Sequence, residues 1–461
     1  MVTACPRTPL YRQREIHQSA LWRILVDHLE VFLRQYDRRF LDSHGPLPPE
    51  AESVMDRLLR CGDPRYGLTL LHCPDCQVHM AVPFSCKTRI CPSCVNRRAE
   101  DVSQSLVERL PHVSYRHVVV TVPIKMGLRK RFRSDRRLLR AMARLIQRVL
   151  CRWMPQQIGC HRNRREERDR ALPGVILAQQ TFGKGLKAHP HWHLLVTDGC
   201  YFPDGTFWAQ GYWDVEGLHD ALRTAILKSL VARCCLTPET AAELGSWPRE
   251  RSGFSAFVGP EMGLPDQEED VRRVLRYILR TALPLKRLRY HEATARVELL
   301  TPRGGIEKSW EHAVDFLADF CQHIPKARQH QVSYAGHFAN ALSKLKQRTE
   351  SAAAVESTAA SPGSKSSRWA ALVLRTWAVD PELCPRCGNT MKRSRPLRDR
   401  TELERLLNNL NIGKYATRPR SPPPPDSDDE PIDEPPPDTP TPWPNQSESQ
   451  IPPGWDEWDA A

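Results

Sequence analysis

The sequence predicts an α+β protein, because strand-like and helix-like segments both recur along the chain. Apolar segments short enough for strands occur at 116–122, 174–181 and 191–197. Apolar residues at helical spacing occur at 10–60, 100–110, 215–235, 268–283 and 308–321. A Cys-rich stretch at 61–94 and an acidic, Pro-rich end at 416–461 mark smaller units beside this main body.

Length and composition limit the class of protein. A chain of 461 residues, 40% of them hydrophobic, is able to bury a large core. It contains no run of about 18 apolar residues, so we expect no membrane-spanning helix and no membrane partner. The first residues lack the apolar stretch of a secretory signal, so we expect a cytoplasmic protein. In that compartment, 15 cysteines indicate thiols and metal ligands rather than a disulfide framework.

Charge is unevenly distributed along the chain. Residues 416–461 hold 2 arginines, 11 acidic residues and 14 of the 40 prolines, which gives this segment a net charge of −9. We expect this tail to be disordered, because it cannot bury enough apolar surface to offset the entropy of ordering. The whole chain carries +13, so residues 1–415 carry +22. Nucleic acid is the commonest partner of such a charge, although an acidic lipid surface or plain solubility would also account for it.

Two Cys-x-x-Cys pairs predict a zinc site. Cys73 and Cys76 form one pair, and Cys91 and Cys94 form a second pair after a spacer of 14 residues. Two such pairs supply four thiolates, which is the ligand set of a structural Zn²⁺.

Four further cysteines leave the ligand assignment open. Cys86 is able to replace one of the four predicted ligands, and Cys61 is also left over near the same stretch. Cys384 and Cys387 form a third pair, with no second pair after it. A His or another chain would have to complete a metal site there.

These features divide the chain into six regions, and a Gly- and Pro-rich break at 45–49 separates two helices within the first. The predicted regions are an N-terminal helical region at 1–60, a zinc-binding module at 61–99, a main domain at 100–350, a flexible Ser- and Ala-rich linker at 351–367, a unit with a Cys pair and a helix at 368–415, and the tail at 416–461.

The segment 191–197 places two histidines on one face of a strand. Side chains alternate along a strand, so His191 and His193 project together while Trp192 projects to the opposite face. Two imidazoles on one rigid strand form a metal site with open positions. If the preceding strand pairs with it as a hairpin, Gln179 or Gln180 lies beside them, and Gln180 is the candidate third ligand. This set, completed by substrate oxygens and water, suits Mg²⁺ or Mn²⁺ on a phosphate.

The amphipathic helix predicted at 268–283 carries a tyrosine at the border of its apolar stripe. Arg273 precedes Tyr277 by four residues and Arg280 follows it by three, so both arginines flank it on one surface. Guanidinium groups there would hold phosphate oxygens and favour the ionised phenol. A tyrosine that only caps a helix–core contact is the plain alternative, and Tyr290 and Tyr334 are rival candidates for a functional tyrosine.

The order of these motifs resembles that of the rolling-circle insertion-sequence transposases of the HUH type, which carry an N-terminal zinc-binding domain. The resemblance runs from about residue 10 to 412 and rests on segments 59–62 (LRCG), 84–94 (FSCKTRICPSC), 118–123 (VVVTVP), 180–183 (QTFG), 189–193 (HPHWH), 275–277 (LRY), 333–337 (SYAGH) and 384–388 (CPRCG). Some relatives have a second tyrosine one helical turn before the first. Arg273 stands in that place here, so the chain resembles a single-tyrosine member.

The resemblance implies a fold, an activity and a set of partners. The main domain would be an endonuclease built on a central antiparallel sheet with helices. His191 and His193 would bind a divalent ion, and Tyr277 would attack single-stranded DNA at the transposon ends to give a 5′-phosphotyrosine. Arg273 and Arg280 would neutralise charge in the transition state. Host replication proteins would be further partners, and the protein would associate with the nucleoid when bound to DNA.

Neither a nucleotide triphosphate nor another organic cofactor is expected. One phosphodiester replaces another in such a reaction, and the chain has no G-x-x-x-x-G-K-[ST] loop. Basic segments at 129–131 and 162–170 are candidate phosphate contacts. A plasmid-type replication initiator or relaxase would share this chemistry, and a non-catalytic zinc protein that regulates by binding DNA is a further alternative. A covalent protein–DNA adduct would distinguish the enzymes from the regulator.

Overall fold

The structure, a computed structural model, describes residues 15–409 except 78, 125–126, 159–164, 249–252, 326–330, 340–381 and 385. Its centre is a five-stranded antiparallel sheet of strand order β12-β4-β5-β3-β8. These strands are β3 (Ser114–Thr121), β4 (Gly174–Phe182), β5 (Ala188–Thr197), β8 (Ser255–Gly263) and β12 (Val332–Gly336). The predicted α+β class and the three predicted strands are therefore confirmed, and the sheet is antiparallel as the resemblance implied.

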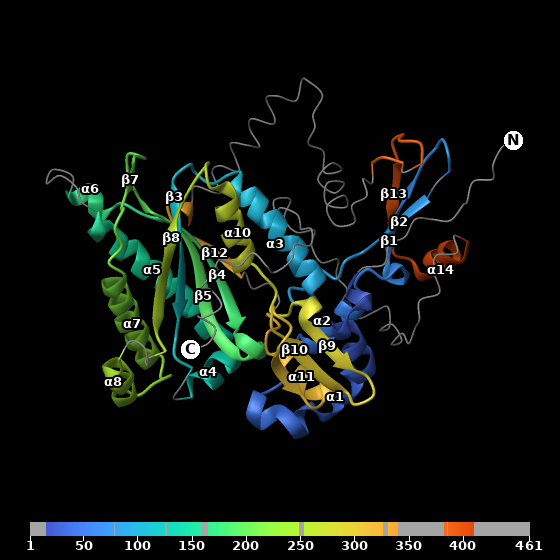
Figure 1. The fold of residues 1–461 in the computed structure, drawn as a ribbon, viewed down its shortest axis with the longest axis horizontal. Helices are drawn as coiled ribbons and strands as arrows, with labels where there is room; N and C mark the ends of the chain where they lie inside the picture. Colours follow the sequence, from blue (N-terminus) through green and yellow to red (C-terminus); the bar gives the residue numbers. More distant parts are fainter. Residues whose placement is uncertain are drawn as a thin grey trace.

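Helices cover both faces of the central sheet (Figure 1). On one face, apolar side chains of β3, β4 and β5 pack against α4 (Leu128–Ser134), α5 (Arg136–Gln157), α7 (Val215–Ala232) and α8 (Pro238–Ser246). On the other face, the strands pack against α3 (Pro92–Val107) and α10 (Glu268–Ile278). Side chains alternate along each strand, so neighbouring residues of one strand belong to different cores.

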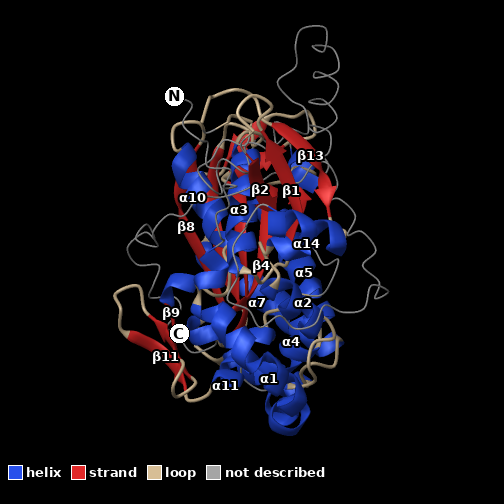
Figure 2. Ribbon diagram, turned by 90° about the vertical axis from the view of Figure 1, so that its right-hand side faces the viewer, coloured by secondary structure: helices blue, strands red, loops and turns tan. Residues whose placement is uncertain are grey.

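The two N-terminal helices share a core with a later segment. Gly45, with φ +77°, follows the end of α1 (Ala20–His44) at the predicted break before α2 (Ala51–Leu59). The apolar residues of both helices pack with β9 (Leu288–His291), β10 (Arg296–Leu300), β11 (Ile306–Trp310) and α11 (Ala313–Cys321). These three strands form a second antiparallel sheet, of order β11-β10-β9, and Figure 2 shows strands of it beside α11 and α1. The described part of the predicted N-terminal region therefore shares one core with residues 283–324.

Three predicted helices differ at their ends. α3 begins at Pro92 rather than at residue 100, because Pro92 occupies the first helical position after Cys91 at the N-cap. α10 ends at Ile278 rather than at residue 283. The segment predicted as a helix over 308–321 is the end of β11 followed by α11, which begins at Ala313. A short apolar run does not by itself distinguish a strand from a helix.

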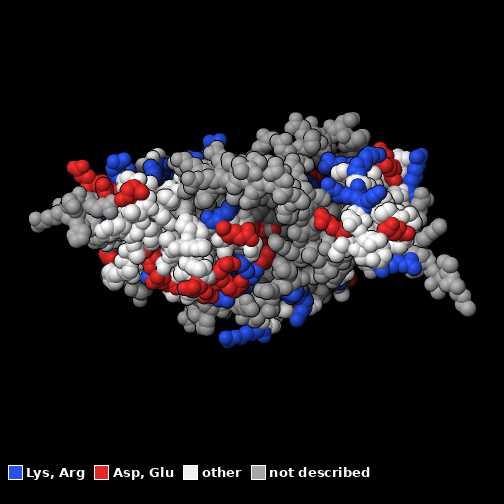
Figure 3. Space-filling model, turned by 90° about the horizontal axis from the view of Figure 1, so that it is seen from above, with Lys and Arg blue, Asp and Glu red and all other residues white. Residues whose placement is uncertain are grey.

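A small third sheet, of order β13-β1-β2, joins a hairpin near the N-terminus to a strand near the C-terminal end of the described chain. β1 (Leu68–His72) and β2 (His79–Pro83) form a hairpin, and β13 (Lys392–Leu397), which precedes α14 (Arg400–Asn409), pairs antiparallel with β1. This sheet lies on the right in Figure 1, and lysine and arginine side chains gather over it in Figure 3. The predicted module at 61–99 and the predicted unit at 368–415 thus contribute strands to one sheet.

The remaining elements are short and lie between the larger ones. They are η1 (Glu15–Gln18), η2 (Pro64–Tyr66), α6 (Arg165–Asp169), η4 (Lys184–Leu186), β6 (Gly199–Tyr201), β7 (Phe207–Ala209) and η5 (Leu285–Arg287). The predicted linker at 351–367 and the predicted tail lie outside the described residues. Among the residues that are described, no helix is long and apolar enough to cross a bilayer.

Candidate active site and cysteine clusters

Strand β5 presents His191 and His193 to the face of the sheet that α10 covers. Their ring centroids lie 4.8 Å apart, and both side chains are almost fully buried. Trp192, between them, is buried on the opposite face, where its ring meets Phe132 edge to face. The alternation predicted from the sequence is therefore present.

Hydrogen bonds hold both imidazoles by their Nδ1 atoms. Nδ1 of His191 donates to the backbone carbonyl of His189 at 2.8 Å. Nδ1 of His193 lies 3.0 Å from Nε2 of His117, on β3. In His191 the lone pair is therefore on Nε2, and the same holds in His193 with its Nδ1 as the donor to His117. Nε2 of His193 is buried and has no hydrogen-bond partner among the described residues.

Burial keeps these histidines neutral. It lowers the pKa of His117 and the pKa of His191 to about 3, and it lowers the pKa of His193 well below the usual value. The positive charge of Arg280 contributes in the same direction at His191 and His193, because it opposes protonation. A neutral imidazole is the form that binds a metal ion.

Gln180, on β4, places an amide oxygen beside the histidines. β4 and β5 pair with Gln180 opposite His191, so the neighbouring Gln179 belongs to the other face. Nε2 of Gln180 donates to the backbone carbonyls of Ile278, at 3.0 Å, and Tyr277, at 3.4 Å. Its Oε1 cannot accept from these carbonyls, and it is buried with no hydrogen-bond partner in the described part of the chain.

Two atoms lack a partner in the described part of the chain, His193 Nε2 and Gln180 Oε1, and they are the feature of this site that fits a cation. Each such atom costs about 1–3 kcal/mol while it is buried without a partner, and binding to an ion would remove that cost. Two imidazole nitrogens with an amide oxygen leave room for water and phosphate oxygens around Mg²⁺ or Mn²⁺. His191, His193 and Gln180 are thus the residues that could hold such an ion.

Tyr277 lies against the histidine pair. The strongly amphipathic α10 packs on the sheet through Val271, Val274, Leu275 and Ile278. At the border of this stripe, the half-buried Tyr277 ring meets His193 edge to face, with 5.3 Å between centroids, and lies 6.2 Å from His117. Arg276 pairs with the buried Glu100 of α3, which ties α10 to its neighbour. The predicted nucleophile and the predicted metal ligands therefore share one site.

The two arginines that flank Tyr277 in the sequence take different positions. The Arg280 guanidinium lies over the Tyr277 ring, 4.4 Å from its centroid. Arg273 pairs instead with Asp270, at 2.7 Å on the same helix, and its side chain is 38% exposed. α10 ends before Arg280, so this residue belongs to the segment after the helix rather than to the helical surface that the spacing predicted.

The rival tyrosines lie on other elements. Tyr290 is on β9 in the second sheet, where its hydroxyl contacts His28 at 2.8 Å and Asp27 at 3.1 Å. Tyr334 is on the edge strand β12 and is 39% exposed, and β4 separates it from β5. Of the three tyrosines, Tyr277 is the one whose ring meets the histidines of β5.

Sequence reasoning missed His117. It lies on β3 two residues before Val119, which pairs with His193, so both β3 residues share the face of the histidine site. The signal in the sequence was a histidine in β3 at a position whose side chain faces the same side of the sheet as His193. That signal becomes readable only when the register between β3 and β5 is known.

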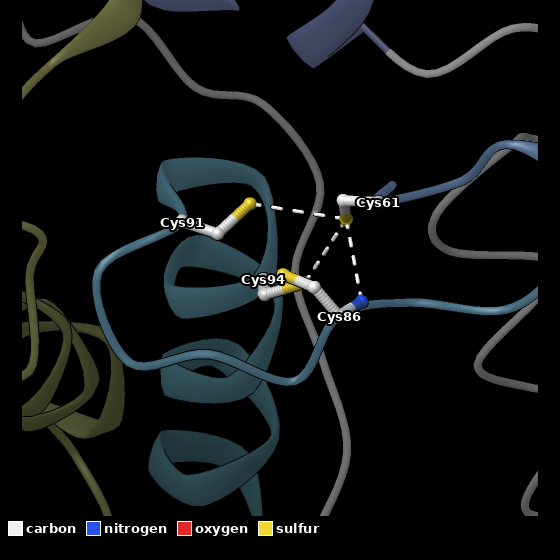
Figure 4. A group of neighbouring side chains, drawn as sticks. All are labelled: Cys61, Cys86, Cys91 and Cys94. Atoms are coloured by element: carbon white, nitrogen blue, oxygen red, sulfur yellow. Dashed lines mark hydrogen bonds between the residues drawn. The ribbon is translucent and has the colours of Figure 1, made fainter. Parts of the chain in front are cut away.

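Four cysteines from three segments form a closed cage (Figure 4). Cys61 follows α2, Cys86 follows β2, and Cys91 and Cys94 lie at the start of α3. Their sulfur atoms lie within 4.8 Å of one another, and three of the separations are 3.5, 3.5 and 3.9 Å. A tetrahedral Zn²⁺ with bonds of about 2.3 Å holds its sulfur ligands about 3.8 Å apart. The cage therefore fits one zinc ion.

The ionisation of the cage thiols would change on binding an ion. Burial raises the pKa of Cys86 well above the usual value, and hydrogen bonding with Cys61 raises that of Cys91. Bound zinc reverses this effect, since a coordinating thiol loses its proton. The cage packs into the core formed by α1, α2 and α11, so the ion would stabilise that whole region.

The remaining pairs form a second group, which consists of Cys73, Cys76, Cys384 and Cys387. The predicted grouping of Cys73 and Cys76 with Cys91 and Cys94 around one ion is therefore wrong. The first pair lies at the turn of the β1–β2 hairpin, whereas the second pair lies beyond the far end of β2. The five residues of β2 extend roughly 17 Å, which is too far for one ion to bridge.

Two family models match the chain. The model described as "Transposase zinc-binding domain" matches residues 32–122, which contain the whole cage of Cys61, Cys86, Cys91 and Cys94. The model described as "Putative transposase" matches residues 174–346, which contain β4, β5 and α10. Together the two models cover more than half of the 461 residues.

Two relatives support the same assignment. The "Putative transposase y4qJ" of Sinorhizobium fredii is 28% identical over 180 residues, which are 38% of this chain and 42% of the relative. The "Transposase for insertion sequence element IS801" of Pseudomonas savastanoi pv. phaseolicola is 28% identical over 186 residues, 40% of each chain. The chain thus spans about two fifths of the length of these relatives, and no solved structure matches it. By its two matched domains, the chain belongs to the insertion-sequence transposases that carry a zinc-binding domain.

Proposed function

We propose that this protein nicks and rejoins single-stranded DNA at the ends of an insertion sequence, in rolling-circle transposition, through a 5′-phosphotyrosine on Tyr277. The observation that carries the proposal is the position of the Tyr277 ring, 5.3 Å from that of His193. The same face of the sheet holds two neutral imidazoles and an amide oxygen that has no hydrogen-bond partner among the described residues. A hydroxyl nucleophile beside a cation site suits the transfer of a phosphodiester.

The reaction exchanges one ester bond for another. Oη of Tyr277 attacks the scissile phosphorus, the bond to the 3′-oxygen breaks, and the phosphate stays attached to the 5′ end of the DNA. The phenol loses its proton to solvent and the departing 3′-oxygen gains one. Attack by another 3′-hydroxyl on the phosphotyrosine reverses these steps. The number of ester bonds is unchanged, so no nucleotide triphosphate is consumed.

Each side chain around Tyr277 has a separate task. An ion held by His191, His193 and Gln180 would polarise a non-bridging phosphate oxygen. Gln180 also binds the last carbonyls of α10, so it couples the tyrosine helix to the metal site. Arg280 would place positive charge beside a transition state that gains negative charge.

Arg273 and His117 would contribute less directly. Arg273 would reach the phosphate only by leaving its pair with Asp270. His117, hydrogen-bonded to His193 Nδ1, would keep the ring oriented with Nε2 toward the ion.

Basic surfaces would hold the DNA backbone. Residues 129–131 of α4 (Arg-Lys-Arg) are exposed, and the described part of the second predicted basic segment begins at α6. Lysine and arginine side chains gather over β13 and α14 in Figure 3. The exposed basic residues of this part of the chain include Lys392, Arg393, Arg395, Arg398 and Arg400. Contacts of this kind position a protein on phosphates without reading the sequence.

Covalent trapping on single-stranded oligonucleotides that carry the element's ends tests the proposal. With Mg²⁺ or Mn²⁺, the wild-type protein should give a nicked product and an adduct that survives denaturing electrophoresis. Tyr277→Phe should abolish the adduct, because the attacking oxygen is gone, while gel-shift binding of the same oligonucleotide is retained. Tyr290→Phe is the matched control and should still form the adduct, because its hydroxyl contacts Asp27 and His28 outside the site.

Other outcomes would select other functions. An adduct that persists in Tyr277→Phe would contradict the assignment, and peptide mapping would then identify the nucleophile. DNA binding by the wild-type protein without any nick would support a non-catalytic regulator. Preferential nicking of a plasmid origin over the element's ends would support a replication initiator or relaxase.

A further inference from the structure

The second cysteine group brings together distant parts of the chain. The sulfur atoms lie 3.5 Å apart in Cys73–Cys387, 3.3 Å apart in Cys76–Cys384 and 3.8 Å apart in Cys76–Cys387. All four lie within 4.8 Å of one another, close to the separation of about 3.8 Å around a tetrahedral Zn²⁺. Cys76 and Cys384 are 308 residues apart in the sequence.

Both pairs lie on the same kind of turn. The residue after the second cysteine has a positive φ in each case, 56° at Gln77 and 75° at Gly388. Its backbone N–H donates to the carbonyl of the first cysteine, at 3.1 Å to Cys73 and at 2.8 Å to Cys384. Two matching turns that present their thiols to a common centre form the ligand arrangement of a structural zinc site.

The sheet that carries these turns has little apolar core. One cluster around the thiols contains Leu71, Met80, Val82 and Met391. A second cluster contains Leu68, Ala81, Leu397 and Leu403. Across the two turns, Asn389 donates to Asp75 at 2.9 Å, but this contact is exposed to solvent. A unit of this size usually requires a metal ion or a disulfide for stability.

We propose that Cys73, Cys76, Cys384 and Cys387 bind a second Zn²⁺, which clasps β13 and α14 onto the β1–β2 hairpin. The first pair belongs to the matched zinc-binding domain, whereas Cys384 and Cys387 lie outside both matched regions. The clasp closes a loop that contains the whole central sheet, because β3 to β12 lie between the two pairs. It also keeps the basic surface of β13 attached to the zinc-binding domain. This site does not depend on the proposed nuclease activity.

Metal analysis of the full-length protein tests the site. The wild-type protein should hold about two zinc ions per chain, and Cys384→Ser with Cys387→Ser should hold about one. Cys234→Ser with Cys235→Ser is the matched control and should keep about two, because this adjacent pair belongs to neither group. Retention of two ions when Cys384 and Cys387 are serine would overturn the site.

Cleavage between the two halves of the site tests the clasp. With a protease site inserted in 351–367, the C-terminal fragment should co-elute with the rest of the cleaved wild-type chain and separate in the Cys384→Ser, Cys387→Ser variant. Wild-type fragments separated by a chelator should rejoin with Zn²⁺ but not with Mg²⁺, which tests the clasp without a substitution. Co-elution in the variant, or separation of the zinc-loaded wild-type fragments, would overturn the clasp.

Discussion

The two faces of strand β5 differ in chemistry although their residues alternate along one backbone. Toward α5 and α7 the strand presents Trp192 and Leu194, which are fully buried in an apolar core. Toward α10 it presents His191 and His193, which are also buried. The first face consists of packed hydrocarbon. The second leaves His193 Nε2 and Gln180 Oε1 without hydrogen-bond partners among the residues that the structure describes.

This difference separates stability from reactivity within a single strand. Packing of a large apolar side chain stabilises a fold by several kcal/mol. A buried polar atom without a partner costs about 1–3 kcal/mol, and the packed face offsets that cost. Substitutions on the two faces should therefore differ in kind: one should weaken the fold, and the other should weaken the reaction.

The largest effect is expected from His191→Ala combined with His193→Ala. Metal-dependent nicking should fall by about 10³-fold or more, because both nitrogen ligands are lost. The measurement is the single-turnover nicking rate at saturating Mn²⁺, compared between the double variant and the wild type. The urea midpoint should change less than it does in Trp192→Ala. Nicking at the wild-type rate would show that the cation binds elsewhere.

The opposite face should respond through stability. Trp192→Ala should lower the free energy of unfolding by about 3–5 kcal/mol, because it empties a fully buried position. Urea denaturation followed by circular dichroism measures this loss. Trp208→Ala is a control at a partly buried position on the same core and should cost less. Equal losses at the two positions would argue against the packed face as the main source of stability.

The smallest of these effects is expected at His117, which acts through another residue. His117→Ala should raise the Mn²⁺ concentration for half-maximal nicking by about 10–100-fold and leave the rate at saturating Mn²⁺ nearly unchanged. His117→Gln retains an acceptor for His193 Nδ1 and should recover part of the affinity. A lower rate that excess Mn²⁺ does not restore would contradict a positioning role.

The cysteines show where prediction from the sequence stopped. Each Cys-x-x-Cys pair was recognisable, because its turn is formed by a few adjacent residues. The partner of each pair was not, because it depends on β13 pairing with β1 across more than three hundred residues. The predicted four-ligand site was therefore wrong in its grouping. Cys61 and Cys86, the two left over, complete the cage of Cys91 and Cys94.

The sequence by itself determined the features that arise within a few residues. These include the shared face of His191 and His193 and the amphipathic helix that carries Tyr277. Only the tertiary structure fixed the strand register that places Gln180 opposite His191, and the contact between His117 and His193. The reason is physical. Backbone geometry sets the periodicity of side chains locally, whereas strand register and ligand partnership depend on packing between residues far apart in the chain.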